Sequence, residues 1–388
     1  MAPGGLRGGP AREIAIFRQN LFRISEPFIT QQAQSLRRHS PIYLGRLRFG
    51  AAPKGAEALA LEDLYQHGTL PRVAWQMLTR DPAPYRRLLA GRRPSLIHAH
   101  FGIDGVYALP LARRLNIPLV TTFHGFDATL MTAALLTSPA WVHYPLFRHQ
   151  LAREGALFLC ASSFIRERLL AMGFPEARTK VHYIGIDHRN IRPRDPGEET
   201  TTILHVGRLV ELKGARYLIR AFADVIGRIR DAQLVIIGDG PLRRPLQRLT
   251  RSLGLENSVR FLGARPHSEV MAWMRKASML VLPSIRTATG RTEGLGMVLL
   301  EAAAIGVPAI GSRVGGIPEV VIHGETGLLV PSRDHEALAL QMRELLENPA
   351  ARHRMGVQAR AHIERNFDIQ AQTEILESYY DSLSGHPG

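Results

Sequence analysis

The sequence predicts an α/β protein built from two doubly wound parallel sheets, and three observations lead to that fold class. The length of 388 residues exceeds one ordinary core and fits two domains of average size. Hydrophobic residues make up 45% of the chain and charged residues 21%, which is typical of a folded globular protein. Short apolar runs alternate with longer amphipathic runs, as strands alternate with helices in parallel sheets, and the alternation restarts near the middle of the chain.

The expected elements follow in order along the chain. Apolar runs in the first half predict strands at Ile14–Phe17, Leu96–His98, Leu119–Phe123, Ala156–Ala161 and Lys180–Ile184. Amphipathic runs between them predict helices at Gly105–Leu115 and Ser163–Met172. The second half repeats the alternation, with expected strands at Thr202–Val206, Leu234–Ile237, Val259–Leu262, Met279–Leu282 and Pro308–Gly311. Its expected helices include Ala215–Ile229, Pro241–Leu253 and His267–Lys276.

One sheet does not comfortably hold about ten strands, so two domains are expected. The segment Arg192–Thr201 is rich in Pro, Gly and Glu and has no apolar periodicity, which marks it as the boundary. We therefore expect one domain over residues 1–192 and another over residues 198–369. Residues 370–388 are expected to form a last helix and a tail, and the helix is expected to pack back on the first domain.

Cysteine content and hydropathy limit the covalent chemistry and the compartment. Cys160 is the single cysteine, so an intramolecular disulfide and a cysteine zinc cluster are excluded. No apolar run approaches the roughly 18–20 residues of a membrane span. The run Ile14–Phe17 is too short for a signal peptide. We expect a cytoplasmic protein.

Positive charge is concentrated in the first half of the chain. Residues 1–195 hold 26 Lys and Arg against 13 Asp and Glu, which is +13 of the total of +15. Six arginines lie within Leu70–Pro94. Aromatic residues lie among them or follow them, namely Trp75, Tyr85, Trp141, Tyr144 and Phe147. Such a surface suits an anionic membrane or single-stranded nucleic acid, and the lack of a nucleic-acid-binding motif favours the membrane. A solvated helix face with its aromatics in the core is the alternative.

Glycine turns after two expected strands of the second half are typical of anion sites. Gly207 and Arg208 follow Thr202–Val206, and Lys213 comes shortly after. Glycine lets the backbone approach a phosphate, which Arg208 and Lys213 can neutralise as a planar fork and as a point charge. The turn at Gly238–Pro241 has a similar form, but an ordinary strand–helix connection has it too.

The most specific signal is the pair Glu293 and Glu301 around a glycine turn and a predicted helix at Met297–Ile305. Gly306 and Pro308 are typical of the end of that helix. The turn leaves backbone N–H groups free at the helix start, where they form an anion site. A helix over the whole interval would place the two carboxylates roughly 12 Å apart, about the span of a nucleotide diphosphate sugar. One carboxylate can then hold ribose hydroxyls and the other sugar hydroxyls.

Histidines follow two neighbouring strands of the first half. His98 and His100 lie at the end of one strand, and His124 and Asp127 follow the next. Imidazoles at strand ends can bond a sugar hydroxyl or stabilise a developing positive charge. The same residues suggest a metal site, but they lack the spacing of a helical histidine pair, which disfavours metal. His98 is expected to be a satisfied core residue, whereas His124, in a loop, is expected to be functional.

Several segments together resemble the retaining glycosyltransferases of family 4, which have the GT-B fold. The most specific is the Glu293–Glu301 frame inside EGLGMVLLEAAAIGVPAIGSRVGGIPEVV. VGRLVELKG, IIGDGPL and FLG precede it in the family's order. SEPFI, HAHFG and TFHGFD more narrowly resemble a subgroup that builds bacterial exopolysaccharides of the colanic-acid type. The resemblance extends from Arg12 to Leu383 and implies two Rossmann-like domains that face a central cleft.

The resemblance also implies roles. Arg208 and Lys213 would bind the donor diphosphate, Glu301 the ribose and Glu293 the sugar. His124 would lie beside the anomeric carbon, and Gly263–Pro266 beside the nucleobase. The implied catalytic residues are His124, Glu293, Arg208 and Lys213. The implied donor-binding residues are Gly207, Arg208, Lys213, Arg265, Gly294, Leu295, Gly296, Met297 and Glu301. The acceptor side would include Ser25, Glu26, His100 and Asp127.

The sequence departs from the family's pattern in two loops. Arg18–Ile29 has no glycine, where many relatives carry a Gly-Gly pair, and it offers Ser25 and Glu26 instead. Ser25 is also a candidate helix cap. Pro27 stands where the subgroup usually has threonine, and Ser284–Thr292 is longer than in many relatives.

The implied reaction moves a sugar from a nucleotide diphosphate sugar to a hydroxyl of a lipid-linked saccharide acceptor, with retention, at the inner face of the cytoplasmic membrane. No cofactor and no bound metal are expected, and the sequence contains no Asp-x-Asp motif. A nucleotide-sugar 2-epimerase of the same fold is the first alternative. A non-enzymatic nucleic-acid-binding protein is the second, but it rests on charge alone, and nucleic acid is not the expected partner.

Overall fold

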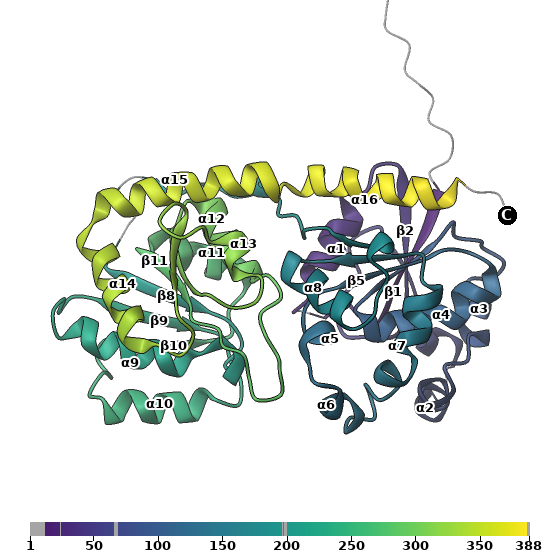
Figure 1. The fold of residues 1–388 in the computed structure, drawn as a ribbon, viewed down its shortest axis with the longest axis horizontal. Helices are drawn as coiled ribbons and strands as arrows, with labels where there is room; N and C mark the ends of the chain where they lie inside the picture. Colours follow the sequence, from purple (N-terminus) through teal and green to yellow (C-terminus); the bar gives the residue numbers. More distant parts are fainter. Residues whose placement is uncertain (1–11, 24, 66–68, 196, 198–199, 386–388) are drawn as a thin grey trace, which may run out of the picture.

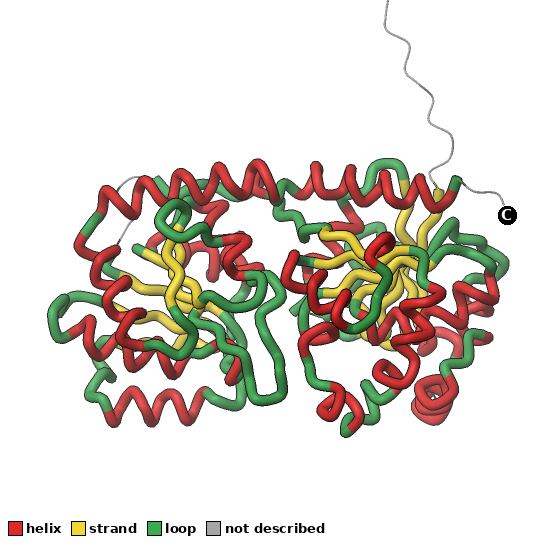
Figure 2. Tube along the Cα trace, in the orientation of Figure 1, coloured by secondary structure: helices red, strands yellow, loops and turns green. Residues whose placement is uncertain are grey.

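We describe the protein from a computed structural model that covers residues 12–23, 25–65, 69–195, 197 and 200–385. Figure 1 shows two α/β lobes side by side, and Figure 2 shows helices around the strands of each lobe. The lobes, called the first and second domains below, carry one sheet each. The predicted fold class is confirmed. The expected domain bounds at residues 1, 198 and 388 lie outside the described residues.

The first sheet is parallel in all its described pairings and has the strand order β3-β2-β1-β4-β5-β6-β7. Its strands are β1 (Arg12–Leu21), β2 (His39–Arg48), β3 (Glu57–Ala60), β4 (Ile97–His100), β5 (Leu119–Phe123), β6 (Leu157–Cys160) and β7 (Thr179–Val181). Its helices are α1 (Pro27–Gln34), α2 (Thr69–Thr79), α3 (Ala83–Leu88), α4 (Gly102–Leu115), α5 (Phe126–Thr129), α6 (Thr132–Leu136), α7 (His143–Glu154) and α8 (Ser163–Ala171).

The second sheet is also parallel, with the order β10-β9-β8-β11-β12-β13. Its strands are β8 (Thr202–Val206), β9 (Gln233–Ile237), β10 (Val259–Gly263), β11 (Met279–Leu282), β12 (Ala309–Ser312) and β13 (Gly327–Val330). Its helices are α9 (Ala215–Ile226), α10 (Arg243–Ser252), α11 (His267–Lys276), α12 (Met297–Ile305), α13 (Ile317–Val320), α14 (His335–Glu347) and α15 (Pro349–Asn366). The strand order reverses direction at β8, so the carboxyl ends of β8 and β11 meet where such sheets bind ligands.

Each expected strand is present, and the structure adds β2, β3 and β13 to them. The sequence of β2 contains Pro41 and Gly45, which usually interrupt strands. Gly45 is required here, because a Cβ at this position would lie 2.4 Å from the carbonyl oxygen of Arg18 on β1. β3 and β13 are four-residue edge strands, too short to give a clear alternation.

The last helix, α16 (Ile369–Ser384), lies on the first domain, as expected. Figure 1 shows α15 above the second domain and α16 continuing above the first. Leu376 and Tyr380 are buried in a cluster with Ile14 and Val120 of the first sheet. Glu377 is 1% exposed, and its Oε1 accepts the backbone N–H groups of residues 37, 38 and 39 at 2.9, 2.6 and 3.1 Å. α16 is therefore part of the first domain's core.

Two local expectations about the first domain are wrong. Ser25 does not cap α1, because the residue before the helix is Glu26, and its side chain caps no backbone group. Tyr85 and Tyr144 do not belong to an exposed aromatic face, because both are fully buried. The other aromatic residues near the basic segment differ in exposure. Trp75 is 62% exposed, whereas Trp141 and Phe147 pack against the hydrophobic core of the first domain. Among the described residues, no helix has both the length and the apolarity to cross a bilayer.

Candidate functional site

A largely buried ion pair joins two glycine-containing turns of the second domain. Lys213 follows β8, and its Nζ lies 2.7 Å from Oε2 of Glu293, in the loop after β11. The hydroxyl of Ser284 donates to the same oxygen at 3.1 Å. Burial raises the pKa of the Glu293 carboxyl, but Lys213 and Ser284 together lower it more, so this pKa falls below its ordinary value. Glu293 is therefore a carboxylate at neutral pH.

Two arginines near this pair have no ionic partner within the described part of the chain. Arg208 is exposed directly after Gly207. Arg291 is half-buried, and its Nε is buried without a hydrogen-bond partner. Burial and the positive charge of Arg208 lower the pKa of Arg291, and Glu293 opposes them. Because Lys213 and Glu293 neutralise each other, Arg208 and Arg291 leave the site positively charged and suited to an anion.

Sequence reasoning missed Arg291. The available signal was a basic residue two positions before Glu293, in the loop Ser284–Thr292. That loop also contacts the first domain. The amide of Met131 donates to the carbonyl of Thr289 at 2.9 Å, and the amide of Thr292 donates to the hydroxyl of Thr129 at 3.4 Å.

Gly294 brings the two domains into backbone contact. A Cβ on Gly294 would lie 2.0 Å from the carbonyl oxygen of His124, so a side chain has no room there. From the first domain, the buried hydroxyl of Ser162 donates to the carbonyl of Gly294 at 2.7 Å. The glycine after Glu293 is thus explained by the close approach of the domains, which brings the backbone of His124 against the residue that follows Glu293. Ser162 is a further residue that the sequence did not single out.

The second glutamate of the frame lies on α12. Glu301 is hydrogen-bonded through Oε1 to Nε2 of His267 at 3.0 Å, and this contact raises the pKa of His267. The predicted helix at Met297–Ile305 is confirmed as α12. Glu293 lies in the loop before it, so the spacing calculated for one helix over the whole interval does not apply. Gly296 enables the start of α12, with a φ of 92° that side-chain-bearing residues rarely adopt.

The remaining predicted donor residues are distributed around these groups. Leu295 is buried in the core of the second domain and Met297 packs against it, so their backbones rather than their side chains are available to a ligand. Gly207 donates its N–H to the carbonyl of Ile237. Arg265 lies at the surface, 3.8 Å from Glu269. Contact of these residues with a donor stays a prediction.

The first domain contributes a column of three imidazoles, His98, His100 and His124, called the imidazole column below. Nδ1 of His100 lies 3.0 Å from Nε2 of His124, and their rings are inclined by only 16°. The rings of His98 and His100 stack with centroids 4.4 Å apart. Phe28 and Phe101 flank His124 at centroid distances of 4.8 and 4.7 Å. Burial lowers the pKa of each of the three imidazoles, so they are neutral at pH 7.

The predicted acceptor-side carboxylates are already engaged within the protein. Both oxygens of buried Asp127 accept backbone N–H groups, from Gly102 at 2.8 Å and from Gly125 at 2.9 Å. Burial raises the pKa of Asp127 to about 6. Asp127 therefore organises the loop that carries His124. Its contact with an acceptor stays a prediction.

The first loop of the chain is held by an arginine that the sequence analysis did not single out. The guanidinium of Arg18 donates to both carboxylate oxygens of Glu26, from Nε at 2.9 Å and from Nη2 at 3.0 Å. It also donates from Nη1 to Oδ2 of buried Asp104 at 2.6 Å. Ser25 is exposed beside this network. The first loop thus carries a charged network, and an acceptor role for Ser25 and Glu26 stays a prediction.

The imidazole column does not provide a metal cage. Across the described residues, no group of three or more His, Cys, Asp or Glu side chains is arranged to hold a metal ion. His100 and His124 bond to each other, and His98 bonds to Tyr380 and Thr122, so their nitrogens do not converge on one point. Whether the reaction uses a metal stays a prediction.

Solved structures share the fold along nearly the whole chain. HepE from Anabaena, crystallised in complex with UDP and glucose, covers 96% of this chain and 100% of its own, with a TM-score of 0.74 and 21% identity. A sucrose-phosphate synthase from Thermosynechococcus elongatus reaches a TM-score of 0.78 at 21% identity and covers 96% of this chain and 99% of its own.

Family models and curated relatives then give the family. Residues 37–190 match the model described as Glycosyltransferase Family 4, and residues 187–362 match Glycosyl transferases group 1. The putative colanic acid biosynthesis glycosyltransferase WcaL of Salmonella typhimurium is 33% identical over 74% of this chain and 70% of its own length. The amylovoran biosynthesis glycosyltransferase AmsK of Erwinia amylovora is 32% identical over 72% and 69%. The chain belongs to the group 1 and family 4 glycosyltransferases.

Proposed function

We propose that this enzyme transfers a sugar, with retention of the anomeric configuration, from a nucleotide diphosphate sugar to a hydroxyl of a lipid-linked saccharide in bacterial exopolysaccharide biosynthesis. The observation that carries the proposal is the charged cluster of the second domain, Glu293, Lys213, Arg208 and Arg291, beside a glycine turn that contacts the backbone of His124. Likeness to HepE, whose crystals hold UDP and glucose, supports a nucleotide-sugar donor. The names of WcaL and AmsK support the polysaccharide product.

The charges of the second domain suit the donor. An intact nucleotide diphosphate sugar carries two negative charges, and Arg208 and Arg291 are the two cations that Glu293 leaves unneutralised. We place the diphosphate against these arginines and Lys213. Glu293 accepts a hydroxyl of the transferred sugar, Glu301 binds the ribose, and Gly263–Pro266 borders the nucleobase.

The transfer step needs charge stabilisation more than a protein nucleophile. The acceptor oxygen bonds to the anomeric carbon as the bond from that carbon to the β-phosphate oxygen breaks, and the electron pair goes to the nucleoside diphosphate. The acceptor proton goes to an oxygen of the leaving diphosphate on the same face. Arginines that already face this group stabilise the charge that develops on it. His124 lies beside the anomeric carbon and binds the sugar.

The same cations make a divalent metal unnecessary. Mg²⁺ and Mn²⁺ commonly neutralise a leaving diphosphate, and here guanidinium groups are present for that purpose. We expect transfer to persist after exhaustive chelation with EDTA. Activity that disappears with EDTA and returns with magnesium or manganese would overturn this part of the proposal.

We place the enzyme at the inner face of the cytoplasmic membrane, with the first domain on the lipid. Arg86, Arg87 and Arg93 are exposed there, and the exposed apolar side chains of Trp75 and Leu78 project from α2. Such a combination binds anionic lipid by charge and by shallow insertion. A lipid-linked acceptor would then meet the site from the first domain.

The direct test is a screen of nucleotide sugars against lipid-linked acceptors with the purified chain, in which the product linkage is identified by NMR. The proposal expects an acceptor-dependent product with the donor's anomeric configuration. An inverted linkage would contradict retention. Donor conversion to its 2-epimer without any acceptor would instead support the epimerase alternative.

A further inference from the structure

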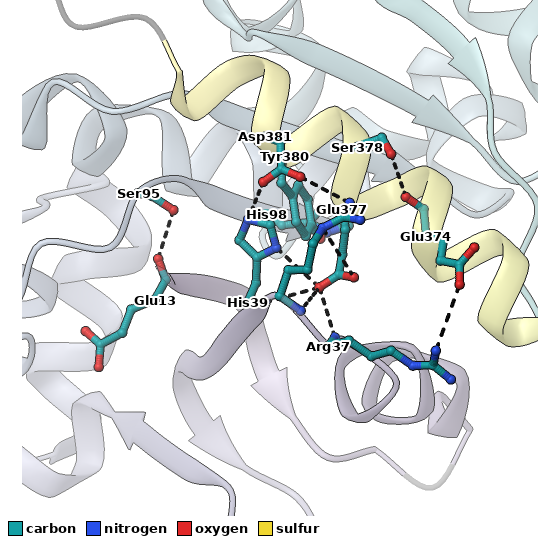
Figure 3. A network of polar contacts seen from close by, with 11 residues as sticks. Glu13, Arg37, His39, Ser95, His98, Glu374, Glu377, Ser378, Tyr380 and Asp381 are labelled. Carbon is teal, nitrogen blue, oxygen red and sulfur yellow. Dashed lines mark hydrogen bonds and ion pairs between the residues drawn. The ribbon is translucent and has the colours of Figure 1, made fainter. Parts of the chain in front are cut away.

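Tyr380 of α16 holds the inner end of the imidazole column. Its hydroxyl lies 2.6 Å from Nδ1 of His98, and Nε2 of His98 lies 2.7 Å from the hydroxyl of Thr122. Both ring nitrogens of His98 are thus occupied, and the ring cannot flip without breaking two buried hydrogen bonds. Figure 3 shows Tyr380 and Glu377 projecting from α16 toward His98 and His39 of the first sheet.

The partners of His98 fix its proton. The Tyr380 side chain is fully buried, and His98 is the hydrogen-bond partner that the structure gives its hydroxyl. A buried phenol needs an acceptor for its O–H group. We therefore assign the Tyr380 hydroxyl as the donor and Nδ1 of His98 as the acceptor. The ring proton of neutral His98 then lies on Nε2 and is donated to Thr122. His98 is a fixed surface on which His100 stacks at 4.4 Å.

His100 stacks on the fixed ring of His98 and is hydrogen-bonded to His124. A neutral imidazole has one donor and one acceptor nitrogen. The 3.0 Å contact between Nδ1 of His100 and Nε2 of His124 therefore couples the two rings, since one nitrogen must donate and the other accept. The direction of this hydrogen bond decides whether Nδ1 of His124 is a donor or an acceptor, because neutral His124 has one nitrogen of each kind. That Nδ1 is buried and lacks a partner in the described structure.

We propose that His100 is a positioning residue that sets the tautomer and ring orientation of His124, and that Tyr380 anchors it through His98. His124 then presents one defined nitrogen, Nδ1, to a hydroxyl of the bound sugar. This assignment rests on the proposed function for the sugar contact alone. It replaces a direct acceptor contact for His100, whose side chain is 1% exposed. It also gives α16 a role at the site although the helix lies at the end of the chain.

The test compares variants that differ by single groups. Tyr380→Phe removes the hydroxyl and keeps the ring, and Tyr379→Phe removes the neighbouring hydroxyl, which has no place in the column. His100→Asn keeps a polar nitrogen near the Nδ1 position, whereas His100→Leu removes it. The ring nitrogens of ¹⁵N-histidine-labelled full-length protein report the tautomer by NMR, with the His124 signals assigned by their loss in His124→Gln. The kcat and donor KM are measured on the same samples, with circular dichroism as the check of folding.

We expect His124 to show one tautomer in the parent and in Tyr379→Phe. In His100→Leu its signals should shift to a tautomer mixture, and kcat should fall by about tenfold or more with donor KM changed little, because the sugar is bound but misplaced. His100→Asn should recover part of kcat, and Tyr380→Phe should show a smaller change of the same kind. An unchanged His124 tautomer in folded His100→Leu and Tyr380→Phe would overturn the proposal. If the parent transfers no sugar, the proposed function fails, while the NMR comparison still decides whether the column sets His124.

Discussion

The two domains meet at one site but contribute opposite kinds of surface to it. The second domain supplies charge on turns at strand ends, with the Lys213–Glu293 pair largely buried, Arg291 half-buried and Arg208 exposed. The first domain supplies neutral rings packed in its interior, with His100 and Tyr380 at most 1% exposed. Partly exposed charges can bind an anionic substrate and release it, because solvent replaces the ligand at low cost. Buried neutral rings bind charge poorly but hold a fixed geometry.

The largest expected difference between the domains is their response to acid. Burial lowers the pKa of a group of histidines in the first domain, namely His98, His100, His124 and His182. Below an ordinary histidine pKa of about 6.5 the unfolded chain binds protons that the folded domain does not. The free energy of unfolding therefore falls as the pH falls, by up to about 1.4 kcal/mol per pH unit for each histidine. Asp127 offsets one of them, because its folded pKa of about 6 favours proton binding in the folded state.

In the second domain, the pKa shifts of the histidines have opposite signs. Burial lowers the pKa of His205 to about 4, whereas the contact with Glu301 raises that of His267. We expect the first domain to lose stability before the second between pH 6.5 and about 5. Urea unfolding followed by tryptophan fluorescence can separate the two domains. The variant Trp273→Phe reports on the first domain through Trp141. The double variant Trp75→Phe, Trp141→Phe reports on the second domain through Trp273. Equal acid sensitivity of the two signals would contradict the assignment of the buried neutral histidines.

Loss of a charged group in the second domain should abolish transfer without unfolding the protein. We expect Glu293→Gln and Arg208→Ala each to lower kcat/KM by roughly 100-fold or more, since both remove charge stabilisation from the reacting atoms. Steady-state transfer kinetics measure the effect, and the thermal unfolding midpoint checks the fold. Near-normal activity in both variants would show that the charged half is not the donor site.

A smaller effect on ligand binding is expected for Arg291, in the loop Ser284–Thr292. Arg291→Gln should weaken the binding of UDP or of the nucleoside diphosphate that binds best by about tenfold, as for one charge-assisted hydrogen bond. Binding of the matching nucleoside, which lacks phosphate, should not change. Arg286→Gln is the control, because Arg286 is an exposed arginine of the same loop. Isothermal titration calorimetry that finds equal losses in the two variants would place Arg291 outside the site.

The smallest effect per residue is expected on the outer face of the first domain. Replacing Arg86, Arg87 and Arg93 by Gln should weaken binding to anionic vesicles by about fivefold for each arginine, which corresponds to about 1 kcal/mol. Arg92 is left in place because Glu57 already binds it. Co-sedimentation with neutral and anionic vesicles at low and high salt measures the loss, and affinity for the nucleotide should stay unchanged. Equal sedimentation with neutral and anionic vesicles would assign the basic excess to another purpose.

The same contrast explains what the sequence could predict. The charged site of the second domain consists of contiguous signals, such as the glycine turn and helix around Glu293, and local rules place both the start and the end of α12. The pairing of Tyr380 with His98 joins residues 282 positions apart, and that of Arg18 with Asp104 spans 86. Such contacts follow from how α16 and α4 pack on the sheet, and no local pattern encodes them. β2 was not among the expected strands for the same reason, because the requirement for Gly45 comes from the neighbouring strand and not from a local pattern.

The division of labour between the charged and the neutral half is tested most directly by pairing Arg208→Ala with His124→Ala. For each variant, the affinity for a nucleoside diphosphate is measured by calorimetry and the transfer rate under saturating donor by product formation. Our account predicts that Arg208→Ala loses affinity for the nucleoside diphosphate, whereas His124→Ala keeps it within about twofold and loses turnover by about 100-fold. A His124→Ala variant that binds the nucleoside diphosphate as poorly as Arg208→Ala, or that transfers sugar at the parent rate, would contradict it.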